Sequence, residues 1–115
     1  MEIIRQIVAY KNYFLDFYND QTDAVQVKIE WTLNLIRVTK HLPEKYFKYL
    51  KGTQGLFEIR IEYGNSTFRI FSFFDKGNLI ILGNAFRKKS RKTPMKELEK
   101  AVKIKEEYFN EKANK

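Results

Sequence analysis

Three runs in the middle of the chain have the hydrophobic pattern of β-strands. Over Leu56–Tyr63, apolar and charged residues alternate, which is typical of a strand with one buried face. Thr67–Phe74 and Leu79–Phe86 are nearly continuous apolar runs of strand length. The connecting segments 64–66 and 75–78 supply the glycine, asparagine and aspartate of tight turns. Because turns this short join antiparallel neighbours, the pattern predicts a three-stranded antiparallel meander.

The N-terminal part of the chain predicts an edge strand followed by two helices. Apolar residues in Ile3–Tyr10 indicate a short strand at the edge of the sheet, and the aromatic run Tyr13–Tyr18 indicates a short helix. The run Val25–Lys40 fits both a strand-like alternation and helical stripes at spacings of three and four. It is longer than an ordinary strand, so we predict a helix, with Asp20 or Thr22 as its N-cap.

The segment after the second predicted helix alternates basic and aromatic residues. It contains Lys45, Lys48 and Lys51 and, between them, Tyr46, Phe47 and Tyr49. Aromatic rings beside ammonium groups can stack nucleic-acid bases while the lysines hold phosphates. Alternatively, Tyr46, Phe47 and Leu50 cover one end of the sheet, with the lysines extending into solvent. The sequence leaves both interpretations open.

The C-terminal residues predict a third helix that starts at Thr93-Pro94. Thr93 can cap this helix, and Pro94 can occupy its first turn, where a missing N–H removes no hydrogen bond. Apolar residues over Leu98–Phe109 continue a helical stripe to near Asn110. Together with the meander and the two N-terminal helices, this helix completes a single α+β domain over residues 1–115.

The composition excludes several classes of site. With no cysteine and one histidine, the chain offers no disulfides, no thiolate zinc site and no cysteine nucleophile. No acids are paired at a spacing suited to metal-assisted hydrolysis and no glycine-rich nucleotide loop is present, so we expect no metal and no cofactor.

No uncharged apolar run reaches membrane-spanning length and no signal-peptide pattern opens the chain. We therefore expect a cytoplasmic protein that does not bind membranes.

Positive charge is concentrated after the third predicted strand. The net charge of the chain is +8, and six basic residues fall within ten positions that contain no acid. These residues are Arg87, Lys88, Lys89, Arg91, Lys92 and Lys96. Such a run is the electrostatic footprint of phosphate contacts, so we assign RNA binding to Arg87, Arg91 and Lys92. The alternatives are a solvated charge run and an anionic membrane surface, although no apolar helical face accompanies the charges.

Arg69 stands in the middle of an apolar strand, where a guanidinium needs a carboxylate, water or an anionic ligand. Pairing around the 64–66 turn places Arg60 opposite Arg69, to within one residue of register. If both arginines share a face, their like charges require an anion. Alternatively, Glu58 or Glu62 neutralises each of them on a solvated face, and spacing alone does not decide between the two.

Four segments of the chain resemble a known family. They are GLFEIR at 55–60, FRIF at 68–71, NAFRKKSRKTP at 84–94 and EEY at 106–108. In this order they resemble the phage-derived branch of the RelE/HigB-like toxins of bacterial type II toxin–antitoxin systems, over about residues 4–108. The resemblance implies a RelE/ParE-like α+β fold, with N-terminal helices packed on a twisted, mainly antiparallel sheet and a C-terminal helix.

The resemblance also implies a function and a site. The function is that of a metal-independent messenger RNA endoribonuclease, acting on the translating ribosome and held inactive by a helix-turn-helix antitoxin. A 2′-hydroxyl would attack the adjacent phosphate and leave a 2′,3′-cyclic phosphate. The implied catalytic residues are Arg60, Arg69, Lys88 and Lys89, and Lys51 and Lys92 are implied as RNA contacts. The alternatives are a ParE-like inhibitor of a topoisomerase and a non-catalytic RNA-binding protein.

The general base of such a reaction is the role that is hardest to fill from this composition. An arginine does not give up its proton, and a lysine can act as a base only where neighbouring cations lower its pKa. Lys88 and Lys89 meet this condition in the sequence, because Arg87, Arg91 and Lys92 surround them.

Overall fold

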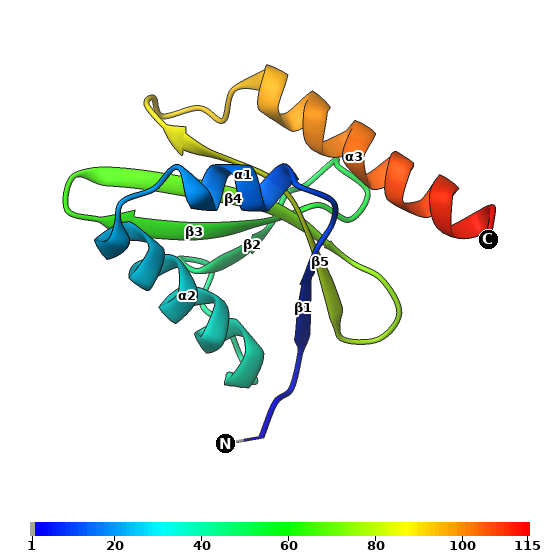
Figure 1. The fold of residues 1–115 in the computed structure, drawn as a ribbon, viewed down its shortest axis with the longest axis horizontal. Helices are drawn as coiled ribbons and strands as arrows, with labels where there is room; N and C mark the ends of the chain where they lie inside the picture. Colours follow the sequence, from blue (N-terminus) through cyan, green and yellow to red (C-terminus); the bar gives the residue numbers. More distant parts are fainter. Residues whose placement is uncertain (1) are drawn as a thin grey trace.

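The computed structural model describes residues 2–115 and has a five-stranded sheet with helices on both faces (Figure 1). The strands are β1 (Gln6–Ala9), β2 (Phe47–Tyr49), β3 (Phe57–Tyr63), β4 (Ser66–Phe74) and β5 (Leu79–Lys88). The helices are α1 (Tyr13–Asn19), α2 (Asp23–Val38) and α3 (Met95–Ala113). The order of strands across the sheet is β1-β5-β4-β3-β2. This architecture confirms the predicted α+β class and the N-terminal and C-terminal helices.

The strands β3, β4 and β5 form the predicted antiparallel meander. Arg60 pairs with Arg69 across β3 and β4, which is the register expected from the tight turn between them. The edge strand β1 is also confirmed, but it runs parallel to β5, a direction that the sequence did not predict. A β-bulge interrupts the pairing of β4 with β5 between Ile70 and Ser72. β5 continues to Lys88, two residues beyond its predicted end, and so carries the start of the basic run.

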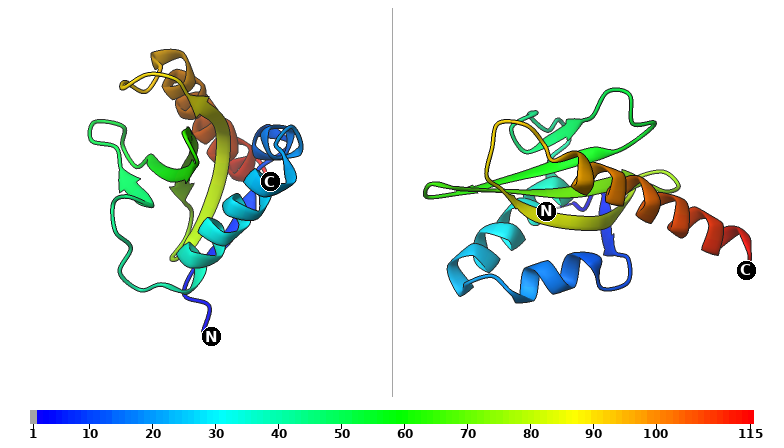
Figure 2. Two further views of the ribbon diagram at one scale, coloured as in Figure 1. Left: turned by 90° about the vertical axis from the view of Figure 1, so that its left-hand side faces the viewer. Right: turned by 90° about the horizontal axis from the view of Figure 1, so that it is seen from above.

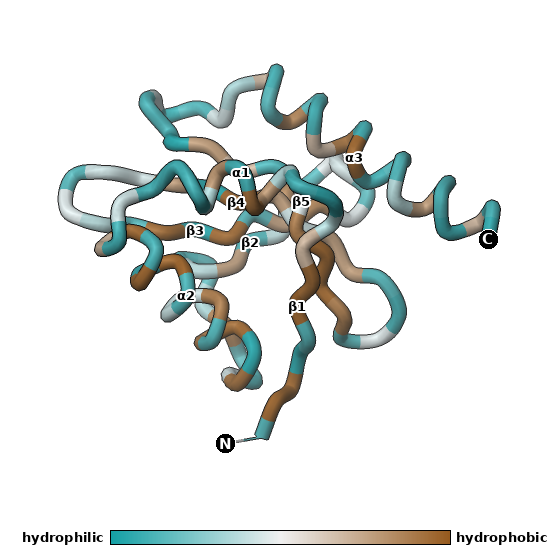
Figure 3. The backbone as a smooth tube through the Cα atoms, in the orientation of Figure 1, coloured by the Kyte–Doolittle hydropathy of each residue, from teal (hydrophilic) through white to brown (hydrophobic). Residues whose placement is uncertain are grey.

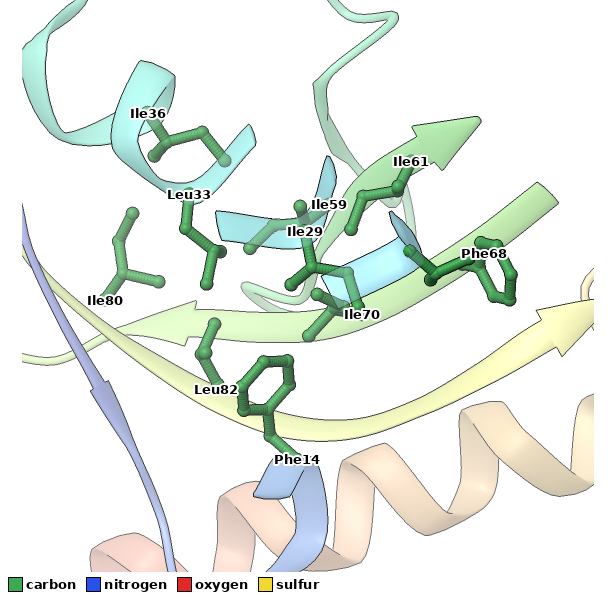
Figure 4. Packing of buried hydrophobic residues seen from close by; sticks show 11 residues of the cluster. Phe14, Ile29, Leu33, Ile36, Ile59, Ile61, Phe68, Ile70, Ile80 and Leu82 are labelled. Atoms are coloured by element: carbon green, nitrogen blue, oxygen red, sulfur yellow. The ribbon is translucent and has the colours of Figure 1, made fainter. Parts of the chain in front are cut away.

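The two faces of the sheet hold separate hydrophobic clusters, as the turned views in Figure 2 show with α3 on one side and α1 and α2 on the other. The larger cluster lies under α1 and α2 and is drawn in Figure 4. It joins Phe14 of α1 and Ile29 of α2 to Ile59 and Ile70 of the sheet. Figure 3 shows the apolar strands at the centre and the alternation of polar and apolar residues along α3.

The helix α2 confirms the helical interpretation of the ambiguous run. The side chain of Thr22 caps it by accepting a hydrogen bond from the backbone N–H of Val25, at 3.3 Å. Ile29 and Ile36 are fully buried, whereas Val27 and Trp31 are 65% and 47% exposed. A strand would have placed Val27, Ile29 and Trp31 on a common face, so the helix is what separates the exposed Trp31 from the buried Ile29.

The helix α3 begins later than predicted, at Met95, and the prediction that Thr93 caps it is wrong. Pro94 occupies the N-cap position and no side chain caps the helix. Thr93 instead donates a hydrogen bond from Oγ1 to Oε2 of Glu58, at 3.2 Å. α3 packs on β4 and β5, and the hydrogen bond of Thr93 ties the segment just before the helix to β3. None of the helices in residues 2–115 has the length and apolar character needed to cross a membrane.

The aromatic and basic segment around residue 47 forms the short edge strand β2. Phe47 stacks on Phe57 of β3, with ring centroids 4.7 Å apart, and Leu50 packs against the cluster under α3. The interpretation that these side chains cover one end of the sheet is therefore confirmed for Phe47 and Leu50. Lys48 pairs with Glu58 in the strand register, which places a further cation next to the strand arginines.

Candidate functional site

The register of the meander brings four charged side chains to the face of the sheet that α3 covers. Alternation along β3 places Glu58 and Arg60 on the face opposite to the buried isoleucines. Arg69 lies directly across from Arg60, on the same face as Phe71. Lys88 follows Phe86 by two positions on β5 and so shares that face as well. Arg60, Arg69 and Lys88 thus come from three adjacent strands and converge on one surface.

Glu58 lies at the centre of this group and contacts both arginines. Its Oε1 lies 3.1 Å from Nε of Arg60 and 3.1 Å from Nε of Arg69. Its Oε2 accepts the hydrogen bond from Thr93, and the residue is only 2% exposed. Glu58 is thus the counterion of both arginines, as one alternative predicted, but the pair with Arg69 is buried and not on a solvated face, and a single carboxylate is shared by two guanidinium groups. The surface keeps an excess of positive charge.

Arg69 is the most buried of the cations, with 6% of its surface exposed. Its Nη1 donates a hydrogen bond to the carbonyl oxygen of Phe68, at 3.1 Å. The contact of its Nε with Glu58 is ionic, because the two atoms are not aligned as a hydrogen bond. Burial lowers the pKa of the Arg69 guanidinium, and the Glu58 carboxylate opposes this shift. Arg69 is therefore a fixed cation that still lacks one directed partner.

A shallow depression of about 380 Å³ opens beside Arg69, at the end of β5. Its lining consists of Thr67, Arg69, Lys88, Lys89, Ser90 and Arg91. Four of these six residues are cations and none is an acid, while the two hydroxyl groups can donate hydrogen bonds. We call this surface the basic depression. A phosphate group fits its chemistry, because it would bring the negative charge that the lining lacks and oxygens that accept hydrogen bonds from the cations and hydroxyl groups.

Lys88 has the electrostatic environment expected of a lysine that can lose its proton. Burial lowers its pKa first, and the positive charges of Arg69, Arg60 and Lys48 lower it further, while Glu58 acts in the opposite direction. The sequence predicted crowding by the neighbours of Lys88 in the basic run. The structure shows crowding by cations on adjacent strands instead, because alternation turns Arg87 to the other face.

The other predicted site residues lie at different distances from the basic depression. Lys89 and Arg91 line it, and Arg60 stands next to it through their common neighbour Glu58. Lys51 lines a separate groove between β2 and the start of α3. Arg87 is exposed on the opposite face of β5, and Lys92 is exposed in the loop before α3. The structure thus gathers four of the predicted residues around Arg69 and leaves three outside.

Two residues that contribute to this surface were absent from the predicted site. Lys48 reaches it through pairing of β2 with β3, and β2 is only three residues long, too short for a sequence signal. Thr93 was assigned to a helix cap, but its hydroxyl holds the central glutamate. In the sequence, the only feature that pointed to Lys48 as part of a binding surface was its position between the aromatic residues Phe47 and Tyr49.

The described part of the chain offers little for a metal ion. Among residues 2–115, no three His, Asp or Glu side chains come together as a ligand set. The lining of the basic depression is cationic and would repel a cation. The arrangement suits an anionic ligand.

Comparison with known proteins places the chain in a family. No curated protein gives a significant match. Residues 16–106, well over half of the chain, match the family described as phage-derived protein Gp49-like (DUF891). The matched region contains β2 to β5, the basic depression and most of α3. The chain therefore belongs to the phage-derived Gp49-like family, a family associated with toxin–antitoxin systems.

Proposed function

We propose that this protein is the toxin of a type II toxin–antitoxin system and acts as a metal-independent endoribonuclease on messenger RNA. The observation that carries the proposal is the basic depression, whose lining has four cations and no acid. A phosphate of the RNA backbone occupies it, next to the guanidinium groups of Arg60 and Arg69. The family match supports the toxin assignment, and the cationic surface supports RNA as the substrate.

The reaction needs no nucleophile from the protein. The 2′-oxygen of a ribose attacks the adjacent phosphorus atom, and the bond from phosphorus to the 5′-oxygen of the next nucleotide breaks. The products are a 2′,3′-cyclic phosphate and a 5′-hydroxyl. Arg69 and Lys89 stabilise the charge that develops on the non-bridging oxygens. Arg60 holds the neighbouring backbone and balances Glu58.

Lys88 is the group on this surface suited to take the proton of the 2′-hydroxyl. Its pKa is lowered by burial and by three neighbouring cations, so a larger fraction of it is neutral than of an ordinary lysine. After the transfer, the protonated Lys88 adds a positive charge beside the pentacoordinate phosphorus. The leaving 5′-oxygen receives its proton from water or from a protonated lysine in the depression.

The partners follow from this reaction and from the family. Messenger RNA engaged on the ribosome is the proposed substrate, which puts the site of action in the cytoplasm. A helix-turn-helix antitoxin is the proposed inhibitor, and it neutralises the protein by covering the positive surface. Lys51 and Arg91 contact the RNA on either side of the scissile phosphate, while Arg87 and Lys92 attract it from a distance.

The variants Arg69→Ala and Lys89→Ala test the site in a translation extract that contains a defined messenger RNA. We expect each variant to lower the cleavage rate by roughly 10²–10³, because each removes a preorganised donor to the transition state. Lys89 is exposed, so its replacement leaves the fold intact even if Arg69→Ala destabilises the sheet. Circular dichroism checks the fold of both.

The same extract separates the alternative functions. A topoisomerase inhibitor would leave the messenger RNA uncleaved in the extract and would cause DNA damage in cells. A non-catalytic RNA-binding protein would neither cleave the messenger RNA nor damage DNA. Cleavage at the normal rate by both variants would show that the basic depression is not the site.

A further inference from the structure

A second cavity lies on the other side of Arg60, at the edge of the sheet. Its volume is about 210 Å³, and its lining consists of Lys28, Thr32, Lys45, Tyr46, Arg60 and Glu62. The cavity exists because β2 stops pairing with β3 at Ile59, apart from one hydrogen bond from the N–H of Arg60 to the carbonyl of Tyr46. Beyond this point α2 closes the free edge of β3.

Two aromatic rings stand at this cavity. Tyr46 lines it, and Trp31 lies against Tyr46 with the ring centroids 6.0 Å apart and the planes at 66°. The Nζ of Lys28 lies 4.2 Å from the centroid of the Trp31 ring, and the Nζ of Lys45 lies 5.0 Å from that of Tyr46. Nearly half of Trp31 is exposed, although it is a large aromatic residue on a helix that could have faced the core.

We propose that Trp31 and Tyr46 form a stacking site for a base of the RNA, next to the nucleotide whose phosphate lies in the basic depression. This inference rests on the proposed nuclease function and extends it to the recognition of a flanking base. Arg60 connects the two sites, because it lines this cavity and is also paired with Glu58 at the catalytic surface. Single-stranded RNA that passes Arg60 would reach the rings of Trp31 and Tyr46. The flanking base would stack there, and the RNA backbone would lie beside Lys28 and Lys45.

The charges around the rings favour RNA over a protein partner. Three cations and one acid, Glu62, line the cavity, so its net charge is positive. Exposed aromatic rings flanked by lysines are the usual arrangement for stacking single-stranded nucleic acid without reading its sequence. Each stacked base typically strengthens binding by about 1–3 kcal/mol, which corresponds to roughly 5- to 150-fold in affinity.

Trp31 is the only tryptophan of the chain, so its fluorescence reports directly on the proposed site. The probe is a single-stranded oligonucleotide with 2′-O-methyl riboses, which the protein can bind but cannot cleave. We expect saturable quenching of the Trp31 fluorescence when the wild-type protein is titrated with it. The variant Trp31→Leu should bind a labelled probe roughly 5- to 150-fold more weakly.

The matched control is Val27→Ala, which removes another exposed apolar side chain one turn earlier on α2. Val27→Ala should bind like the wild type. Unchanged binding by Trp31→Leu, with cleavage still present, would overturn the stacking site alone. Equal losses in the two variants would also overturn it, because they indicate a general apolar docking surface.

The outcomes also separate this inference from the proposed function. Quenching and a loss in Trp31→Leu without any cleavage by the wild type would support the stacking site and remove only the nuclease. The absence of oligonucleotide binding by the wild-type protein would overturn the stacking site, and the nuclease function would be overturned with it only if messenger RNA on ribosomes is not cleaved either.

Discussion

At the scale of single residues, Glu58 decides how the cationic surface is built. It is almost fully buried and serves as the counterion of both Arg60 and Arg69. One carboxylate cannot balance two guanidinium groups and Lys88, so the surface is assembled in advance but is still short of negative charge. An RNA phosphate would supply that charge without breaking the existing ion pairs.

The variant Glu58→Gln tests this balance. We expect a loss of stability on the order of 3 kcal/mol, because two buried or half-buried cations lose their counterion. Inorganic phosphate should restore part of the loss, since an anion that binds only the folded state stabilises it. The measurement is thermal unfolding with and without phosphate. The same response to phosphate in Glu58→Gln and in wild type would mean that the cations are not held as one anion-binding group.

Lys88 gives a second prediction at this scale, concerning the pH dependence of cleavage. A lowered pKa means that the neutral, basic form of Lys88 becomes available below the ordinary lysine range, so the single-turnover rate should rise with pH and level off below pH 10.5. Lys88→Arg keeps the positive charge but cannot lose its proton. We expect this variant to lose the rising limb and roughly 10²–10⁴ in rate. A pH profile in Lys88→Arg that matches wild type would assign the base to another group.

At the scale of elements, the position of α3 determines where the site can be reached. Its first residues come just after Thr93, whose hydroxyl donates a hydrogen bond to Glu58. Its later turns cover β4 and β5. The C-terminal half is held by Asp75, which accepts hydrogen bonds from Tyr108 at 2.6 Å and from Lys112 at 2.7 Å. Lys11 forms a further ion pair with Glu107, at 2.9 Å.

This attachment predicts an acid-sensitive contribution to stability. The bonds from Lys112 and Tyr108 lower the pKa of Asp75 below its ordinary 3.8, so the carboxylate stabilises the fold above that pH. The contribution is lost as the pH falls through the lowered pKa. We expect Asp75→Asn to have a lower Tm than wild type at pH 7 and a difference that shrinks below pH 3.8.

The matched control is Asp20→Asn, which alters an exposed aspartate after α1 and should leave the Tm almost unchanged. Thermal unfolding followed by circular dichroism between pH 7 and pH 2.5 makes the comparison. Curves of Tm against pH that run parallel for Asp75→Asn and wild type would show that Asp75 does not hold α3.

At the scale of the whole molecule, local patterns in the sequence predicted most of the fold. The meander, its register at Arg60 and Arg69, and the three helices depend on alternation, turn residues and helical spacing, all of which are local. The parallel pairing of β1 with β5 joins distant segments, and β2 has only three residues, so neither leaves a periodic signal in the sequence.

The site was predictable to a lesser degree, for the same reason. The turn placed Arg60 opposite Arg69 to within one residue, and the family resemblance named Arg60, Arg69, Lys88 and Lys89, but the sequence left open whether the two arginines share a face. The face of Arg87 and the approach of Lys48 depend on the end of β5 and on β2, so the sequence could not assign them. For Thr93 the sequence made a clear prediction that was wrong. The local pattern predicts a helix cap, but the Thr93 hydroxyl donates a hydrogen bond to Glu58, which is distant in the sequence.

The central claim is that cations on one face of the sheet, rather than positive charge in general, cleave RNA. Lys88 and Arg87 are adjacent on β5 and point to opposite faces, so they form a matched pair. The most direct measurement is the single-turnover cleavage rate of a messenger RNA on ribosomes at saturating protein, with the new 5′-hydroxyl ends mapped. We expect Lys88→Ala to lower the rate by roughly 10²–10³ and Arg87→Ala to leave it within a few-fold of wild type. Equal rates for the two variants, or no new ends with the wild-type protein, would contradict the account.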